Sequence, residues 1–218
     1  MAEFLLELYS EEIPHGLQIS AREEIKQKLL KSLEEESIKY KSAEVYSTPT
    51  RLALLIRDLP SEIKIAAKEV KGPKVGVPEN IIEGFMRSHQ ITKKDLYEKT
   101  EEKGKFYCFK KLAKKTQTED LLVKLTPKAI GAVNWKKSMR WSDHDLMWGR
   151  PLRSILAIFN NKHLKFEYHH LTSTDGAIIV DNFIDKIKKV KNFKEYESLL
   201  KTNKIFLKQE DRKNNIIK

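Results

Sequence analysis

Three groups of residues in this sequence are of types that carry out acid-base or metal chemistry. Residues 11–12 are adjacent glutamates, residues 143–145 place His144 between two aspartates, and residues 169–170 are adjacent histidines. A reaction centre of this kind also needs a nucleophile or a third metal ligand. Neither accompanies these groups in the sequence, so each is interpreted as loop, turn or strand chemistry. We expect no catalytic residue and no metal site in this chain. An independent small-molecule enzyme that uses His144 stays open as a minor alternative.

Residues 72–76 have the sequence GPKVG, which is too short for a Walker-type loop and carries no lysine-hydroxyl pair after its second glycine. A loop of that kind needs the spacing Gly-x-x-x-x-Gly-Lys-Ser/Thr to hold phosphates. The sequence therefore excludes this mode of nucleotide binding.

Side chains suited to phosphate and base contacts are concentrated between residues 135 and 153. Lysine and arginine neutralise phosphates, and indole or guanidinium planes stack on unpaired bases. A structural alternative stays open, because tryptophan is usually buried and an arginine beside it stacks on it or pairs with Asp143 or Asp145. Arg51, between a proline turn and an apolar strand, has the same two interpretations. The candidates for RNA contact are Arg51, Lys136, Lys137, Arg140, Trp141, Arg150 and Arg153.

The charge of the chain supports an anionic partner. The 218 residues include 42 Lys and Arg against 31 Asp and Glu, a formal net charge of +11. Residues 1–60 contain 8 basic and 11 acidic side chains (−3), residues 91–140 contain 14 and 6 (+8), and residues 181–218 contain 11 and 6 (+5). A regional excess of cations raises the local concentration of phosphates, so nucleic acid is the leading partner class. A solvated lysine-rich face is the alternative.

The elements that must position these residues follow from hydrophobic periodicity. Residues 4–9 predict a strand, and a helix from Leu17 has one apolar stripe: Ala21, Ile25, Leu29 and Leu33. Residues 43–47 and 52–57 predict two strands with a turn at Pro49. The chain thus begins with a β-α-β-β unit.

The middle and the end of the chain predict further short elements. Glycines and prolines in residues 71–80 predict a loop, followed by a helix at 80–88 and a strand at 105–112. A helix starts at Thr118, and Pro127 should kink or break it. Strands at 152–159 and 163–168 flank Asn160-Asn161, which favours a hairpin. Beyond them we expect strands at 177–180 and 204–207, a helix at 194–200, and the start of a helix from Gln209.

This order of elements predicts an α+β fold with mixed or antiparallel sheets and packed helices. We divide the chain into residues 1–70, 71–170 and 171–218, the last expected to be cut off from a longer chain because Ile216 and Ile217 end a helix without a capping glycine. No apolar run reaches the length of a membrane span, and the single cysteine, Cys108, excludes an internal disulfide. We expect a soluble chain in a reducing cytoplasm.

Three sequence segments together go beyond composition. They are residues 5–14 (LLELYSEEIP), residues 47–53 (STPTRLA), and residues 137–141 with 149–153 (KSMRW and GRPLR). Their order and spacing resemble the N-terminal part of the beta subunit of the bacterial heterotetrameric glycyl-tRNA synthetase. Weaker support comes from residues 71–73, 84–85, 196–197 and 211–213.

The resemblance implies a division of labour between two subunits. The alpha subunit of that family resembles a class II catalytic core that binds glycine and ATP with Mg, and the beta subunit is needed for activity and engages tRNA(Gly). It implies two alpha and two beta chains, later beta-subunit domains beyond Lys218, no cofactor bound by this chain, and no activity of this chain alone. One departure concerns the Gly-His-Arg stretch usual in the family, because Ala177 and Ile178 follow Gly176 here. The alternative function is a subunit-assembly module without direct RNA contact.

Overall fold

The computed structural model describes residues 2–65, 67–101, 104–111 and 114–217 of the chain. The chain forms two compact units, one of residues 1–63 with 117–218 and one of residues 64–116. The second unit is therefore an insertion in the sequence of the first. The division at residues 70 and 170 follows different boundaries and stays a prediction.

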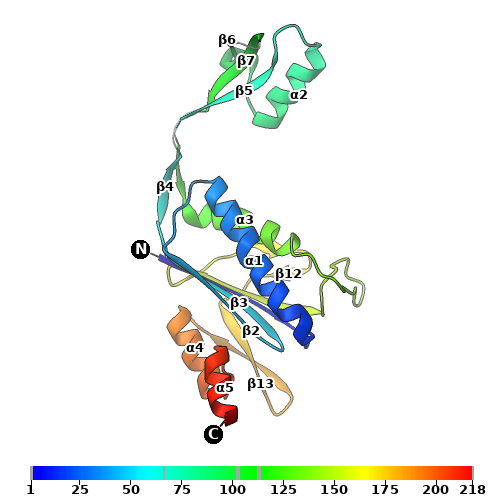
Figure 1. Cartoon of the computed structure of the whole chain (residues 1–218), viewed down its shortest axis with the longest axis vertical. Helices are drawn as coiled ribbons and strands as arrows, with labels where there is room; N and C mark the ends of the chain where they lie inside the picture. Colours follow the sequence, from blue (N-terminus) through cyan, green and yellow to red (C-terminus); the bar gives the residue numbers. More distant parts are fainter. Residues whose placement is uncertain (1, 66, 102–103, 112–113, 218) are drawn as a thin grey trace. The chain divides into compact units, whose positions relative to one another are not determined.

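A five-stranded antiparallel sheet is the centre of the first unit (Figure 1). Its order is β10 (Lys162–His163), β9 (Leu152–Phe159), β1 (Ala2–Ser10), β3 (Arg51–Leu59) and β2 (Ser42–Thr48). β1 occupies the middle and is buried on both faces, which explains why its sequence is almost continuously apolar instead of alternating. The strands expected in these segments are confirmed.

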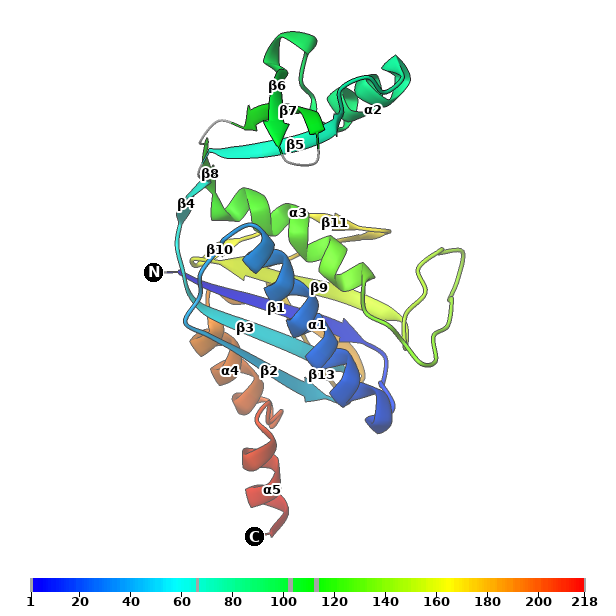
Figure 2. The same ribbon diagram turned by 45° about the horizontal axis from the view of Figure 1, so that its top comes forward.

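Two helices cover one face of this sheet (Figure 2). They are α1 (His15–Glu35) and α3 (Thr118–Gly131). The buried residues of α1 are the four of the predicted stripe: Ala21, Ile25, Leu29 and Leu33. Each fully buried leucine side chain contributes about 1.5 to 3 kcal/mol relative to exposure, so this face fixes α1 against β2, β3 and α3.

The helix break that the sequence predicted as one possibility at Pro127 is absent from α3. The helix continues through Pro127 to Gly131. Proline removes one backbone donor, but Thr126, Ala129 and Ile130 on either side of it are all buried. Packing of these residues against the core therefore holds both parts of the helix in place.

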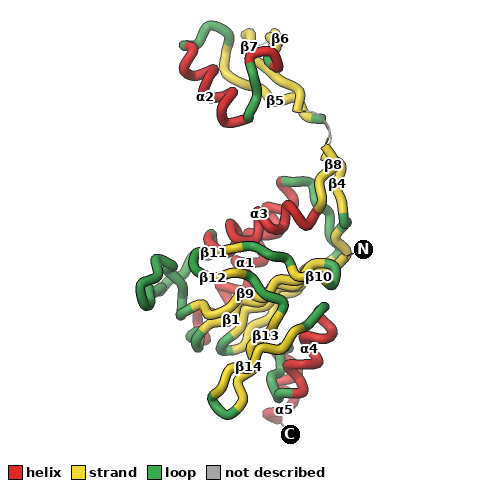
Figure 3. The backbone as a smooth tube through the Cα atoms, turned by 180° about the vertical axis from the view of Figure 1, so that it is seen from behind, coloured by secondary structure: helices red, strands yellow, loops and turns green. Residues whose placement is uncertain are grey.

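The opposite face of the sheet is covered by β13 (Gly176–Asp181) and α4 (Phe193–Thr202), and β14 (Ile184–Lys189) pairs with β13, as Figure 3 shows from behind. The buried residues form one cluster: Leu5, Ala53, Leu55, Leu156, Ile158, Ala177, Ile179, Val190, Phe193, Tyr196, Leu200 and Leu207. The expected strand and helix in this region are confirmed, while β14 was not predicted. Its six residues are all exposed and show no apolar face.

Tight turns organise the rest of this unit. Asn160 and Asn161 both have positive φ, of 50° and 61°, so the hairpin between β9 and β10 is confirmed. The expected second strand is shorter, because β10 ends at His163 and β11 (Glu167–Tyr168) pairs instead with β12 (Leu171–Thr172).

The strand expected at residues 204–207 is wrong. Lys204 has a φ of 59°, and the Ile205 N–H donates to the Leu200 carbonyl at 2.9 Å. These are the features of a helix C-terminal cap. Lys204 and Ile205 therefore end α4 and are not part of a strand. α5 (Gln209–Ile217) then begins where the sequence predicted it.

The second unit contains a three-stranded antiparallel sheet of order β5 (Lys68–Lys74), β7 (Gly104–Lys111) and β6 (Tyr97–Glu101). The helix predicted at 80–88 is α2 (Glu79–His89), and a short 3-10 helix follows at Lys93–Asp95. The prediction of a loop from residue 71 is wrong, because β5 continues to Lys74. It is an edge strand whose pairing is irregular between Lys71 and Lys74, where an edge tolerates Gly72 and Pro73.

At the junction of the units, β4 (Glu62–Ile65) pairs with β8 (Lys114–Gln117). Helices and antiparallel sheets in both units confirm the α+β class. Among the described residues, no helix is long and apolar enough to span a membrane.

Candidate nucleic-acid interface

Three loops that are far apart in the sequence meet at one end of the central sheet. The Ser10 N–H at the end of β1 donates to the Thr50 carbonyl at 2.9 Å, and the Ile13 N–H donates to the Pro49 carbonyl at 2.7 Å. The Glu11 N–H donates to the Pro151 carbonyl, just before β9, at 2.9 Å. Backbone hydrogen bonds thus fix the segment between β1 and α1 against both the β2–β3 turn and the start of β9.

The loop of residues 132–151, which joins α3 to β9, is held at the same end of the sheet. Within this loop, Met139 and Trp148 exchange backbone hydrogen bonds of 2.8 and 3.2 Å, which hold its two arms together. The Arg150 Nε donates to the Glu12 carbonyl at 3.2 Å, which joins the loop to the segment before α1. The loop therefore has a fixed position relative to the N-terminus of α1.

Two tryptophans anchor this loop from inside. Trp148 is 1% exposed, and its ring meets the half-buried Trp135 ring edge-on, with centroids 4.8 Å apart. A Cβ added at Gly149 would lie 2.2 Å from the Trp135 ring, so only glycine fits at that position. The packing of these two indoles supports the interpretation that they have a structural role. Any contact with RNA would then be made by side chains on the outside of the loop.

A groove of about 490 Å³ separates the loop from the first turn of α1. Its lining residues are Pro14, Gly16, Leu17, Lys136, Lys137, Ser138, Met139, Gly149 and Arg150. Lys136 and Lys137 are exposed, and no described carboxylate lies within ion-pair distance of either ammonium group. The first turn of α1 contains no acid and its N-cap makes no side-chain hydrogen bond, so no side chain of that turn neutralises the positive end of the helix dipole. The groove therefore favours anions.

Arg140 and Trp141 lie on the outer part of the loop. The Arg140 guanidinium lies 3.5 Å from the carboxylate of Asp145. Asp145 is one of the two aspartates with which the structural interpretation paired an arginine of this loop. The arginine side chain is 60% exposed, so this surface pair contributes little stability and leaves most of the guanidinium available. Trp141 is half-buried and meets the His170 ring edge-on, with centroids 5.9 Å apart.

Arg153 is already engaged by protein groups. Its guanidinium pairs with Glu11 at 3.2 Å and with Asp185 of β14, and it lies over the Tyr9 ring at 5.7 Å. The side chain is 40% exposed. Contact with RNA through Arg153 would compete with these two carboxylates.

Arg51 is placed in the core by the structure. Its side chain is 3% exposed, its Nε lies 3.0 Å from Glu7 Oε2, and it donates to the Ile178 carbonyl. It also lies over the Tyr9 ring at 4.6 Å. These contacts favour the structural interpretation of Arg51.

Sequence reasoning missed the two partners that complete this buried network. Glu7 is 1% exposed in the middle of β1 and accepts a hydrogen bond from the Tyr196 hydroxyl of α4. Burial raises the pKa of the Glu7 carboxyl above its ordinary value, and the charge of Arg51 opposes that rise. The pKa of Tyr196 is raised for the same reason, first by burial and then by the Glu7 charge. A glutamate between apolar residues on both sides within β1 was the sequence signal for a buried ion pair.

Comparison with known proteins identifies the family of the chain that carries these loops. The family model described as glycyl-tRNA synthetase beta subunit matches residues 4–218. This chain belongs to that family. A glycine–tRNA ligase beta subunit from Rickettsia peacockii is 35% identical over 215 residues, which are 97% of this chain and 32% of the relative. The corresponding protein of Rickettsia prowazekii is 34% identical over 212 residues, or 96% and 31%. The chain thus spans about a third of the length of these curated beta subunits.

The segments that carried the resemblance to glycyl-tRNA synthetase beta subunits are the ones that meet at the end of the sheet. Residues 5–14, 47–53 and 149–153 exchange the backbone hydrogen bonds described above, and residues 137–139 of the third segment line the groove. The recognisable sequence pattern therefore corresponds to one place in the fold.

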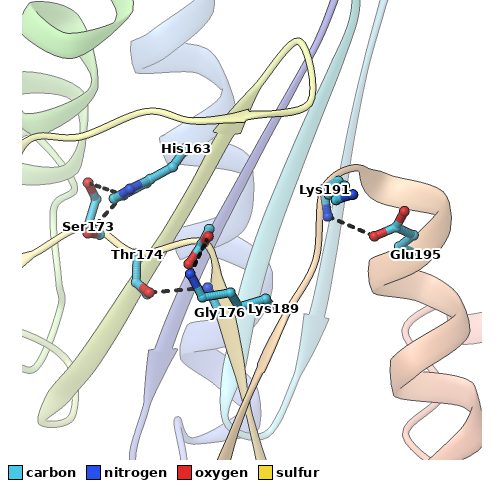
Figure 4. Close-up of polar contacts among 8 residues, drawn as sticks. His163, Ser173, Thr174, Gly176, Lys189, Lys191 and Glu195 are labelled. Atoms are coloured by element: carbon cyan, nitrogen blue, oxygen red, sulfur yellow. Dashed lines mark hydrogen bonds and ion pairs between the residues drawn. The ribbon is translucent and has the colours of Figure 1, made fainter.

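The segment that departs from the family pattern is held by local polar contacts. Figure 4 shows the Gly176 N–H donating to the Thr174 hydroxyl at 3.1 Å and the His163 ring 2.9 Å from the Ser173 carbonyl oxygen. The Ser173 hydroxyl donates to the Leu164 carbonyl and accepts from the Phe166 N–H, both at 2.8 Å. A Cβ at Gly176 would lie 2.4 Å from the Ile187 side chain, so the start of β13 has room only for glycine.

Two of the histidines singled out in the sequence, His144 and His170, stack on each other. His144 and His170 lie with their ring centroids 3.5 Å apart and their planes within 5°. His169 has a φ of 52° and lies in a turn, so it does not alternate with His170 along a strand. Among the described residues, no group of three His, Cys, Asp or Glu side chains could hold a metal ion.

This stack predicts a pH response. Burial, and then the charges of His144 and His169, lower the pKa of His170 below its ordinary value. The unfolded chain binds this proton more tightly, so the contribution of His170 to stability is present above pH 6.5 and is lost as the pH falls through the lowered pKa. We expect His144→Ala to raise the pKa of His170, measured by NMR titration of the imidazole protons. An unchanged His170 pKa would contradict the stacked arrangement.

Proposed function

We propose that this chain helps a glycine–tRNA ligase attach glycine to tRNA(Gly) by binding tRNA phosphates in the groove between the 132–151 loop and α1. ATP and Mg would bind, and the reaction would take place, on the alpha subunit, in a cytoplasmic assembly of two alpha and two beta chains. The observation that carries the proposal is the convergence of the family's segments on a groove lined by Lys136 and Lys137.

The chemistry of the groove supports phosphate as its ligand. Ammonium groups are compact charges on flexible stems, and they contact phosphate oxygens without strict geometry. The positive end of α1 adds a fixed partial charge beside them. Arg150 hydrogen-bonds to the protein backbone, so it holds the wall of the groove and leaves the two lysines to meet the ligand.

The test is a double variant in the enzyme assembled from alpha and full-length beta subunits. We expect Lys136→Ala with Lys137→Ala to raise the Kd for tRNA(Gly) about tenfold at 0.1 M salt and to lower kcat/KM for glycylation. The matched control is Lys28→Ala with Lys31→Ala, which removes the same charge from the exposed side of α1. If both pairs of changes have the same effect, the groove is not the contact.

A subunit-assembly role without RNA contact is the second candidate, and one observation favours it. The β13–β14 hairpin exposes four large apolar side chains: Val180, Phe183, Ile184 and Ile187. Exposed apolar clusters mark protein contacts more often than RNA contacts. If Phe183→Ser with Ile187→Ser abolishes co-purification with the alpha subunit while the groove variant binds tRNA normally, assembly replaces RNA binding as the function of this chain.

A further inference from the structure

The inserted unit of residues 64–116 carries most of the net positive charge of the chain. It contains 14 basic and 7 acidic side chains, a net of +7, and the remaining residues contain 28 and 24, a net of +4. About a quarter of the sequence thus holds more than half of the excess positive charge.

One face of the sheet in this unit is covered by α2. The Phe85 and His89 rings of α2 pack against Phe109 of β7, with centroids 5.8 and 5.2 Å away. Gly72 of β5 lets the helix approach, because a Cβ there would lie 2.7 Å from the Phe85 ring. The side chains that alternate with Phe109 along β7 therefore point to the other face.

Strand register shows which residues share that other face. Cys108 of β7 is opposite Lys71 and Tyr97, and Phe106 is opposite Lys74 and Lys99. Lys110 is opposite Glu69. Directly opposite residues of antiparallel strands point the same way. We call the four cations of this surface the lysine face: Lys71, Lys74, Lys99 and Lys110.

The lysine face surrounds a covered aromatic ring. The Nζ of Lys71 lies 3.5 Å from the centroid of the Phe106 ring and that of Lys74 lies 5.8 Å from it. Phe106 is 9% exposed, so it offers little apolar surface. Glu69 of β5 pairs with Lys99 and accepts a hydrogen bond from the Tyr97 hydroxyl at 2.6 Å, so this carboxylate is already engaged by protein groups.

We propose that the lysine face binds the phosphate backbone of RNA and is a second contact for the tRNA of the proposed function, on which the identity of the RNA rests. A polyanion fits better than a protein partner, since protein interfaces need an apolar core and the aromatic ring here is already covered. Flexible ammonium groups on a sheet match a regular row of phosphates without reading bases.

The experiment measures tRNA(Gly) binding by the assembled enzyme as a function of salt. Lys74→Gln with Lys110→Gln removes two charges of the lysine face and keeps Lys71, which packs on Phe106. We expect the Kd to rise about tenfold at 0.1 M salt and the salt slope to fall by about 1.5. The control, Lys94→Gln with Lys105→Gln, removes two exposed cations elsewhere in the same unit, and should change the Kd less than twofold.

The outcomes separate this inference from the groove. Equal binding by the lysine-face variant and its control overturns the inference, even where the Lys136 and Lys137 variant binds weakly. Weak binding by the lysine-face variant alone supports the inference and counts against the groove. Thermal unfolding is the control for folding. If both variants unfold at the same temperature as the wild type, a loss of binding is not caused by a loss of folding.

Discussion

Replacing Arg51 with methionine is expected to lower the free energy of unfolding of the chain by about 3 to 5 kcal/mol. Glu7 would keep its place in the core between β1 and α4 and lose the cation 3.0 Å away. Methionine fills much of the volume of the arginine and provides no charge, so the main cost is that of leaving the Glu7 carboxylate uncompensated in the core. Chemical denaturation of the variant and the wild type measures the difference.

The dependence on pH makes this result specific. Arg51 lowers the pKa of Glu7 against the effect of burial, so removing it lets that pKa rise further. The folded variant then binds a proton more tightly than the unfolded chain, and its stability falls as the pH rises through the Glu7 pKa. The deficit should therefore shrink toward acidic pH.

Glu7→Leu in the Arg51→Met background is the control, because it removes both charges. We expect the double variant to recover much of the lost stability, as replaced buried ion pairs often do. A double variant as unstable as the sum of the two single variants would show that the pair does not act as described.

Trp148→Ala is expected to cost about 3 to 5 kcal/mol and to weaken tRNA binding as well. The indole is 1% exposed and cannot itself meet RNA, but its packing against Trp135 fixes the loop that carries Lys136 and Lys137. Denaturation of the chain and tRNA affinity of the assembled enzyme measure the two effects. Trp141→Ala serves as the control, since Trp141 is half-buried at the loop surface and should affect stability much less.

Local patterns in the sequence predicted local structure well. The stripe from Ala21 to Leu33 predicted the buried face of α1, and two asparagines predicted the turn at residues 160–161. These features depend on residues within one or two turns of each other, so a single sequence contains the information.

The errors arose where long-range contacts outweigh local preference. Gly72 and Pro73 are turn residues by preference, but β5 lies at an edge and Phe85 needs the space of the missing Cβ. Residues 204–207 have an apolar strand-like pattern, but the N–H groups of Lys204 and Ile205 bond to carbonyls at the end of α4. The strand β14 pairs with β13 without an apolar face of its own.

The candidate site was predictable in its residues and not in its geometry. The sequence pointed to Lys136 and Lys137, but the approach of their loop to the start of α1 depends on contacts across more than a hundred residues, such as Arg150 to Glu12. The buried position of Arg51 likewise depends on Glu7 of the neighbouring strand, whose carboxylate also accepts from Tyr196 of α4, and no local pattern brings these residues together.

The salt dependence of tRNA(Gly) binding by the assembled enzyme tests most directly whether the groove holds phosphates. Each lost phosphate contact lowers the slope of log Kobs against log salt by roughly 0.7 to 0.9. For Lys136→Ala with Lys137→Ala, the account predicts a slope shallower than the wild type by about 1.4 to 1.8. A slope equal to that of the wild type would contradict it.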